Sequence, residues 1–154
     1  MMKKIMFICH GNICRSPMAE FVFKKMLKEN GLESDFVVSS SATSTEEIWN
    51  GIGNPVYPPA REELARHGIN CDGKRAVQLT KSDYEKYDML ICMDSRNVRN
   101  ALVILGGDPD KKLLKLMDLT QKGGDVADPW YSGDFSTAYR DIESGCKALL
   151  EKFI

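Results

Sequence analysis

Two kinds of hydrophobic pattern alternate along the chain. Short, unbroken apolar runs predict buried strands at residues 5–8, 36–38, 89–93 and 113–116. Apolar residues that recur at spacings of three and four predict helices at residues 17–30, 59–67, 95–105 and 136–153, with a short helix after Thr80. The stretches 39–58 and 120–135 show neither pattern and are predicted to be irregular loops.

This alternation of strands and helices predicts an α/β fold in a single domain, with a parallel sheet covered by helices on both faces. Ligands of such sheets bind beyond the carboxyl ends of the strands. Three polar segments follow predicted strands and should therefore meet at one edge of the sheet: residues 9–16, 39–57 and 119–131. We expect the functional site at this edge.

Composition and charge narrow the possible functions. The chain has 154 residues, of which 43% are hydrophobic and 28% charged, as is usual for one globular domain. Its formal net charge of -1 gives no indication of nucleic-acid or membrane-surface binding. No apolar run approaches the roughly 20 residues that span a bilayer. The first apolar stretch ends at Cys9, too soon for a signal peptide, so a cytoplasmic location is expected.

The cysteines and histidines argue against disulfides and zinc. An odd number of cysteines, five, in a chain expected in the cytoplasm does not suit a disulfide framework. There is no CxxC pair, and His10 and His67 are the only histidines, so no metal site is expected. Cys92 and Cys146 lie in apolar patterns and are predicted core residues, whereas Cys71 is assigned no role.

The segment that joins the first strand to the first helix carries the strongest chemical signal. A tight loop at this place points successive backbone N–H groups into one cavity, and the following helix adds the positive end of its dipole. Such a site suits a tetrahedral phosphate. The residues expected to surround the phosphate are Cys9, His10, Gly11, Asn12, Ile13, Cys14, Arg15 and Ser16.

Within this loop, Cys9 is the predicted nucleophile. Thiols at helix N-termini or beside cations ionise readily, and a thiolate can attack phosphorus directly. Arg15, six residues after Cys9, can fold back and grip two phosphate oxygens. Ser16 is expected to donate a hydrogen bond to the sulfur. We expect Gly11 to supply a backbone conformation with positive φ, and Asn12 to fix the shape of the loop.

Hydrolysis of a phosphate ester also needs an acid that protonates the leaving group. Asp128 is the predicted acid, because a carboxyl group beside a phosphate dianion holds its proton more readily. Trp130 and Tyr131 follow it and can offer flat faces at the mouth of the cavity. Asp118 and Asp125 lie nearby and compete with Asp128 for this role.

The motif from Cys9 to Ala19, together with Asp128 to Tyr131, resembles the low-molecular-weight protein tyrosine phosphatases, and the resemblance covers essentially the whole chain. It implies one domain over residues 1–154, a four-stranded parallel sheet, and neither cofactor nor metal. It also implies a cysteinyl-phosphate intermediate on Cys9, with Arg15 stabilising the transferring group. Asp128 would protonate the leaving group and then activate water. The implied substrate is a phosphotyrosine protein or a small aryl phosphate, acted on by a monomer or weakly self-associating enzyme.

The resemblance extends to residues around the loop. Cys14 resembles a second loop cysteine that forms a reversible disulfide with the nucleophile, and Ser40 matches a serine that supports the loop through Asn12. Trp49 resembles an aromatic residue that flanks the substrate ring; core packing is the alternative for it. Ile13, Trp130 and Tyr131 are the other expected ring contacts.

Three features depart from the family pattern, one of which is that residues 56–61 lack an Asp common near there. His10 stands at a loop position that is often apolar. Lys74 stands where many members carry a histidine that supports the loop, which leaves that hydrogen-bond network an open question.

Three other functions compete with hydrolysis of phosphotyrosine. An arsenate reductase of the same fold needs two further cysteines, of which Cys92 could be only the first. A protein arginine phosphatase tends to carry Thr in place of Ile13, whose larger apolar side chain favours a phenyl ring. A non-catalytic phosphate-binding module would need neither the thiol at Cys9 nor the acid at Asp128.

Overall fold

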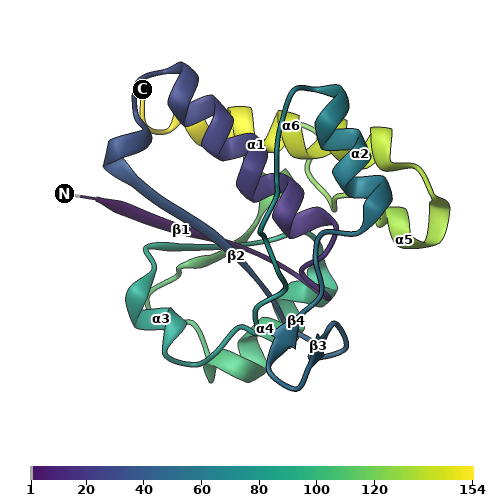
Figure 1. Ribbon diagram of the computed structural model, residues 1–154. Coiled ribbons are helices and arrows are strands. Elements are labelled where there is room, and N and C mark those ends of the chain that lie inside the picture. Colours follow the sequence, from purple (N-terminus) through teal and green to yellow (C-terminus); the bar gives the residue numbers. More distant parts are fainter. Residues whose placement is uncertain (1) are drawn as a thin grey trace.

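The computed structural model describes residues 2–154, so Met1 of the predicted domain lies outside the described residues. Four parallel strands form the central sheet in the order β2-β1-β5-β6 (Figure 1). The strands are β1 (Lys3–Cys9), β2 (Phe36–Ala42), β5 (Met89–Cys92) and β6 (Leu113–Lys115). This architecture confirms the predicted single-domain, three-layer α/β fold with a four-stranded parallel sheet.

Alternate residues of β1 face two separate cores. Ile5 and Phe7 pack against the layer formed by helices α1 (Arg15–Glu29), α2 (Pro58–Arg66) and α6 (Phe135–Glu151). Met6 and Ile8 pack on the other face against the layer formed by α3 (Asp83–Lys86) and α4 (Ser95–Leu105). Because both faces are buried, the strand reads as a continuous apolar run. Figure 1 shows the two helical layers above and below the sheet.

In the larger core, a cluster of phenylalanine rings packs α1 and the segment after α6 against β1 and β2. Phe23 of α1 makes edge-to-face contacts with Phe7 and Phe36, each with ring centroids 6.0 Å apart. Phe153, just after α6, contacts Phe36 at 5.0 Å. Edge-to-face pairs of this kind add to the free energy gained by burying the rings. They fix α1, and therefore the loop before it, relative to β1.

The irregular stretches contain more structure than the sequence predicts. β2 continues to Ala42, because Ser40 and Ser41 are buried and hydrogen-bond inside the protein although their side chains are polar. A hairpin of β3 (Ile48–Trp49) and β4 (Ile52–Gly53) follows. The prediction that residues 39–58 are irregular throughout is therefore wrong.

The second predicted loop, 120–135, also contains a regular element. Helix α5 (Pro129–Ser132) forms one turn in it, with proline at its first position and the Asp128 side chain capping its N-terminus. Two short 3₁₀ turns lie elsewhere, η1 (Glu33–Asp35) and η2 (Leu116–Leu119). The other predicted helices are present, with ends that differ by one or two residues, as in α1, which begins at Arg15 and not at Pro17.

The strand order places a switch point at the middle of the sheet. The chain leaves β1 toward β2 on one side, then crosses to β5 on the other side of β1. Connections diverge at such a point and leave a crevice beyond the carboxyl ends of the strands. The loop after Cys9 and the residues after Cys92 both begin there. No helix within residues 2–154 is long and apolar enough to cross a membrane.

Gly145 sets the distance between α6 and η2, and we expect its replacement to destabilise the fold. A Cβ atom there would lie 2.9 Å from both Cδ atoms of Leu116, which is fully buried. Gly145→Val should therefore lower the free energy of unfolding by about 2 kcal/mol or more. Ser144→Val, on the exposed face of the same helix, is the matched control and should change it by less than about 0.5 kcal/mol. Urea denaturation measures both, and equal losses would contradict the packing argument.

Candidate active site

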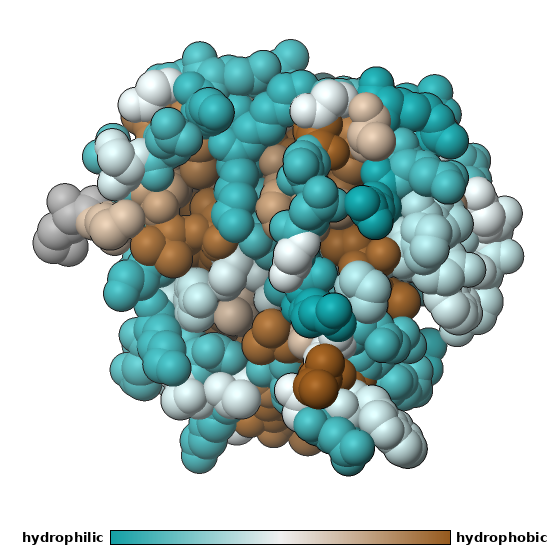
Figure 2. All heavy atoms as spheres, viewed as in Figure 1, coloured by the Kyte–Doolittle hydropathy of each residue, from teal (hydrophilic) through white to brown (hydrophobic). Residues whose placement is uncertain are grey.

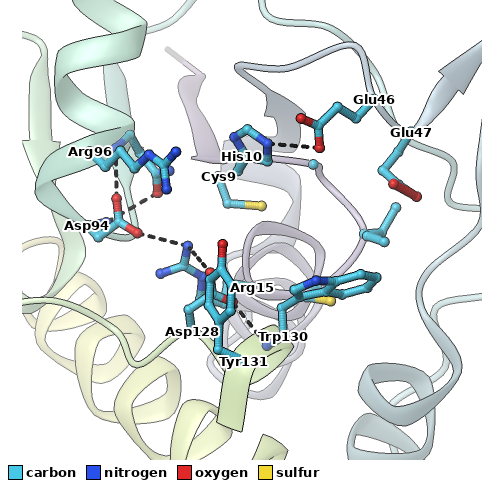
Figure 3. A pocket seen from close by; sticks show the side chains of 14 residues that line it. Cys9, His10, Arg15, Glu46, Glu47, Asp94, Arg96, Asp128, Trp130 and Tyr131 are labelled. Carbon is cyan, nitrogen blue, oxygen red and sulfur yellow. Dashed lines mark hydrogen bonds and ion pairs between the residues drawn. The ribbon is translucent and has the colours of Figure 1, made fainter. Parts of the chain in front are cut away.

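A cavity of about 270 Å³ opens beyond the carboxyl ends of β1 and β5. Four segments line it: the loop 9–15, residues 46–47 before the hairpin, residues 94–97 at the start of α4, and residues 128–131. Figure 3 shows their side chains pointing toward a common space. The structure thus brings together the three segments that the sequence analysis placed at one edge, and adds a fourth, which that analysis missed.

The sulfur of Cys9 lies at the base of this cavity among hydrogen-bond donors. The backbone N–H groups of Asn12 and Ser16 point at Sγ from 3.3 and 3.4 Å. The Ser16 hydroxyl lies 2.9 Å from Sγ and donates to it when the sulfur is a thiolate. Hydrogen bonds of this kind favour the anionic form of an acceptor. The loop thus surrounds the sulfur with three hydrogen-bond donors.

Asn12, and not Gly11, adopts the left-handed backbone conformation in the loop, with φ of 58°. The prediction for Gly11 is therefore wrong. Asparagine tolerates this conformation better than most residues, and here three side-chain hydrogen bonds hold it. Nδ2 donates to Ser16 Oγ (2.8 Å) and Ser40 Oγ (2.9 Å), and Oδ1 accepts from the backbone N–H of Val77 (3.0 Å). These contacts match the role of shaping the loop that the sequence analysis gave Asn12.

Gly11 lies close to another residue of the cavity lining. A Cβ atom on Gly11 would lie 3.2 Å from Cγ of Glu47, so a larger residue would require the Glu47 side chain to shift by a few tenths of an ångström. Asn12 and Ser16 do not line the cavity, because their side chains point down into the support of the loop. The other predicted members of the phosphate loop all line it: Cys9, His10, Gly11, Ile13, Cys14 and Arg15.

A chain of polar groups beneath the loop ends at Lys74. Ser40 Oγ donates to Glu20 Oε1 at 2.6 Å, and Lys74 Nζ donates to the carbonyl oxygen of Ser40 at 3.1 Å. Lys74 Nζ also lies 3.8 Å from Glu20 Oε1, while Lys24 pairs with Oε2 at 2.6 Å. Burial lowers the pKa of Lys74, and Glu20 opposes that shift. The lysine thus occupies the place of a loop-supporting residue, and Glu20 is a member of the network that sequence analysis missed.

Arg15 is 3% exposed, with one hydrogen-bonded carbonyl group and two carboxylates around it. Nη1 donates to the carbonyl oxygen of Val126 at 2.9 Å, and Nη2 lies 2.9 Å from Asp94 Oδ2 and 3.6 Å from Asp128 Oδ2. Burial disfavours the charged guanidinium, but Cys9, Asp94 and Asp128 together raise the pKa of Arg15 above its ordinary value. The guanidinium is therefore a fixed positive charge beside the thiol.

Asp94 has a second contact that explains its position. Its Oδ1 accepts from the backbone N–H of Asn97 at 2.7 Å, while Asn97 Oδ1 accepts from the backbone N–H of Asp94 at 3.2 Å. This reciprocal cap begins α4. Sequence analysis missed Asp94 as a site residue, although its place directly after a predicted strand was a usable signal.

Of the three carboxyl groups considered as the acid, only Asp128 lines the cavity. Its Oδ1 accepts from the backbone N–H of Trp130 at 3.1 Å, and its side chain is 35% exposed. Asp125 pairs with Lys115 at 3.0 Å, and hydrogen bonds from Lys115 and Ser95 lower its pKa although burial opposes this. Asp118 is exposed. The geometry thus favours Asp128 over both competitors.

Aromatic side chains form one side of the cavity mouth. Trp130 and Tyr131 line the cavity and are 55% and 80% exposed, while Ile13 lines it from the loop. Opposite them, His10 Nε2 lies 3.1 Å from Glu46 Oε2 (Figure 3). A flat apolar group that enters the cavity would pass between these walls.

Trp49 lies outside the cavity lining. It is 79% exposed on the β3–β4 hairpin, so the alternative of core packing is wrong for it. Ile52, its cross-strand partner, is 62% exposed. Figure 2 shows hydrophobic atoms protruding over this hairpin, one of several hydrophobic areas on that face. The contact of Trp49 with a substrate ring stays a prediction.

All five cysteines are free thiols, and their surroundings differ. Cys14 lines the cavity, and burial together with the nearby Cys9 and Asp128 raises the pKa of its thiol. Cys92 and Cys146 are fully buried, as predicted for core residues. Cys92 packs in the α3–α4 core, outside the cavity lining, which does not favour a place for it in an arsenate reductase relay. Within residues 2–154, no three metal-ligating side chains gather to hold an ion.

The fold and the cavity define a class of protein, namely α/β proteins in which the loop after the first strand presents a thiol to a cavity beyond the carboxyl ends of the strands. Comparisons with known proteins give the family. Residues 4–153 match the sequence model described as low molecular weight phosphotyrosine protein phosphatase. The chain belongs to this family, whose members hydrolyse phosphoric monoesters.

Individual relatives are similar over nearly their full length. The low molecular weight protein-tyrosine-phosphatase YfkJ of Bacillus subtilis is 35% identical, over 97% of this chain and 94% of the relative. The human low molecular weight phosphotyrosine protein phosphatase is also 35% identical, over 97% and 95%. The crystal structure of YfkJ superposes with a TM-score of 0.93, covering 99% of this chain and 95% of that one. A phosphatase structure from Streptococcus pyogenes gives 0.85 at 37% identity, covering 99% and 94%.

Two substitutions at Asn12 distinguish the effect of its backbone conformation on stability from the effect of its side-chain hydrogen bonds on activity. Asn12→Gly and Asn12→Ala both remove the three side-chain hydrogen bonds, so each should lower kcat roughly 10- to 100-fold by misplacing the loop. Alanine must also adopt a φ of 58°, which glycine does at little cost. The free energy of unfolding of Asn12→Ala should therefore be about 1 kcal/mol lower than that of Asn12→Gly.

The matched control is Asn50, which is exposed on the hairpin and has a φ of 50°. Asn50→Ala and Asn50→Gly should show the same difference in unfolding free energy, measured in urea, with kcat unchanged. Full activity of Asn12→Gly would show that the hydrogen bonds of Asn12 are dispensable for the loop.

Proposed function

We propose that this protein hydrolyses phosphotyrosine monoesters of proteins through a cysteinyl-phosphate intermediate. The observation that carries the proposal is the position of Cys9 Sγ, with three hydrogen-bond donors around it, at the base of a cavity that Arg15 and Asp128 also line. The names of the similar proteins, which are tyrosine phosphatases of bacteria and vertebrates, support the choice of phosphotyrosine.

In the first step, the Cys9 thiolate attacks phosphorus and forms an S–P bond while the P–O bond to tyrosine breaks. The electron pair of that bond stays on the phenolic oxygen, which takes a proton from the Asp128 carboxyl group. Arg15 offers a planar pair of N–H donors to the transferring phosphoryl oxygens. Because the guanidinium is already held next to the thiol, little reorganisation is needed.

In the second step, water attacks the phosphorus of the intermediate and the S–P bond breaks. The Asp128 carboxylate left by the first step accepts the proton of the attacking water, which restores the acid. Cys9 leaves as a thiolate, and the Ser16 hydroxyl donates to it at the distance of 2.9 Å. Inorganic phosphate is the second product, and the reaction needs no further reactant.

The walls of the cavity support an aromatic substrate. Trp130 and Tyr131 present flat faces at the mouth, and Ile13 adds an apolar surface inside. These contacts suit the ring of phosphotyrosine or of a small aryl phosphate better than the flexible, polar chain of phosphoarginine. We retain phosphoarginine as the rival substrate in the test below.

Several further properties belong to the same proposal. Cys14 lines the cavity with Cys9 and would form a reversible disulfide with it under oxidation. The free state of all five cysteines suits a reducing compartment, in keeping with a cytoplasmic location. We propose a monomer or weakly associating enzyme that works without metal, cofactor, nucleic acid or membrane.

The substrate assignment is tested by measuring turnover of a phosphotyrosine peptide, a phosphoserine peptide and phosphoarginine side by side, with chelator present. We expect the phosphotyrosine peptide to have the highest kcat/KM, and Cys9→Ser to abolish its turnover. A higher kcat/KM for phosphoarginine would show that the proposed substrate is wrong, while the proposed mechanism would still stand. Absence of turnover by the folded, reduced enzyme would overturn the function.

The role of Asp128 is tested through the leaving group. Asp128→Asn should lower kcat about 10²- to 10⁴-fold for phenyl phosphate, whose leaving group needs a proton. The loss should be much smaller for an activated aryl phosphate with an acidic phenol. Asp118→Asn, which removes an exposed carboxylate ten residues earlier, is the control and should change neither rate. Equal losses of Asp128→Asn on both substrates would count against general acid catalysis.

A further inference from the structure

A second cavity, of about 600 Å³, lies beside the candidate active site. Its walls come from residues 54–58, from the outer face of α2 and from residues 71–74. Ile13 and Glu47 line both this cavity and the first. The two cavities are therefore neighbours that share a wall, and we call the second one the flanking groove.

Ile13, in the wall that the two cavities share, is held in place by a backbone hydrogen bond. The carbonyl oxygen of Ile13 accepts a hydrogen bond from the backbone N–H of Tyr57 at 2.8 Å, which ties the phosphate loop to the start of α2. The ring of Tyr57 lines the flanking groove and contacts the ring of Trp130, with centroids 4.9 Å apart. Trp130 lines the first cavity. A chain with one aromatic side chain in the first cavity can thus continue over Ile13 into the groove.

The groove has an apolar surface with a charged rim. Pro55, Val56 and Ala65 contribute apolar surface. At the rim, Arg61 and Asp72 pair with each other at 2.9 Å. An extended peptide can lie on such a surface, because apolar contacts tolerate many side chains and the paired rim charges offset one another.

The remaining charge on the rim is negative. Glu47 and Glu62 both line the groove, and neither takes part in an ion pair within residues 2–154. Lys74 also lines it, but its ammonium group is turned to the Ser40 carbonyl oxygen and to Glu20. Glu47 is partly exposed and accepts a hydrogen bond from Asn54 Nδ2 at 3.1 Å, and Glu62 is exposed. Two carboxylates without an ion-pair partner thus lie beside an apolar surface, which is complementary to a basic side chain.

We propose that the flanking groove binds the segment of the substrate polypeptide next to the phosphotyrosine, and favours a lysine or arginine in that segment. This inference rests on the proposed function, because it needs a phosphotyrosine in the first cavity. It goes beyond that function by assigning a second contact area, outside the catalytic cavity, that distinguishes one phosphoprotein from another. Small aryl phosphates do not reach it.

The test compares kcat/KM for alanine-rich phosphotyrosine peptides that carry lysine or glutamate one to three positions before or after the phosphotyrosine. For the wild type, we expect lysine to be preferred over glutamate by about threefold to tenfold on one side. Glu62→Lys should abolish or reverse this preference. Ala65→Trp, which fills the groove, should raise KM for every peptide. Turnover of p-nitrophenyl phosphate should stay unchanged in both variants.

Glu33→Lys is the matched control, since it makes the same change of charge at an exposed position beyond the far end of α1. If it alters the peptide preference as Glu62→Lys does, the effect comes from net charge and the inference is wrong. Peptide turnover that is unaffected by Glu62→Lys and Ala65→Trp would also overturn it. A change of sedimentation behaviour in Ala65→Trp, without a change in KM, would assign the groove to contacts between copies of this chain instead. Loss of all phosphotyrosine turnover in the wild type would overturn the proposed function itself.

Discussion

The hydrogen bonds of the Asn12 side chain hold the site together. One amide group connects the loop that carries Cys9 to the first turn of α1, to the buried end of β2 and to the backbone near Val77. It holds Asn12 itself in a left-handed conformation, which turns the chain so that two N–H groups point at the sulfur. Ser40, which accepts a hydrogen bond from Asn12, in turn donates one to Glu20 and accepts one from Lys74 at its carbonyl oxygen. The geometry around the thiol thus depends on polar groups that never line the cavity.

Charge balance is the second constraint on the site. A buried guanidinium is costly unless it is paired, and Arg15 has Asp94, Asp128 and a carbonyl oxygen around it. A thiolate at Cys9 adds another negative charge on the other side. These groups hold the positive charge at the edge of the cavity. In the proposed reaction, this charge would be in place before the substrate arrives.

Much of the fold followed from hydrophobic periodicity, since buried parallel strands and amphipathic helices leave clear patterns. The pattern failed where burial involved polar residues, as at Ser40 and Ser41, whose partners come from distant parts of the chain. The spacing of Cys9 and Arg15 identified the loop. It could not show that Asn12 rather than Gly11 has a positive φ, because the hydrogen bonds that hold Asn12 come from residues 16, 40 and 77. The place of Asp94 directly after a predicted strand could have marked it as a site residue, but its contact with Arg15 exists only in three dimensions.

Asp94 has one oxygen on the N-terminus of α4 and the other on Arg15. The helix belongs to the layer on the far side of the sheet, while the arginine lines the cavity. Any change in the contact between Arg15 and Asp94 would therefore act on the N-terminal cap of this helix as well. One carboxylate thus joins the wall of the candidate active site to the far helical layer of the protein.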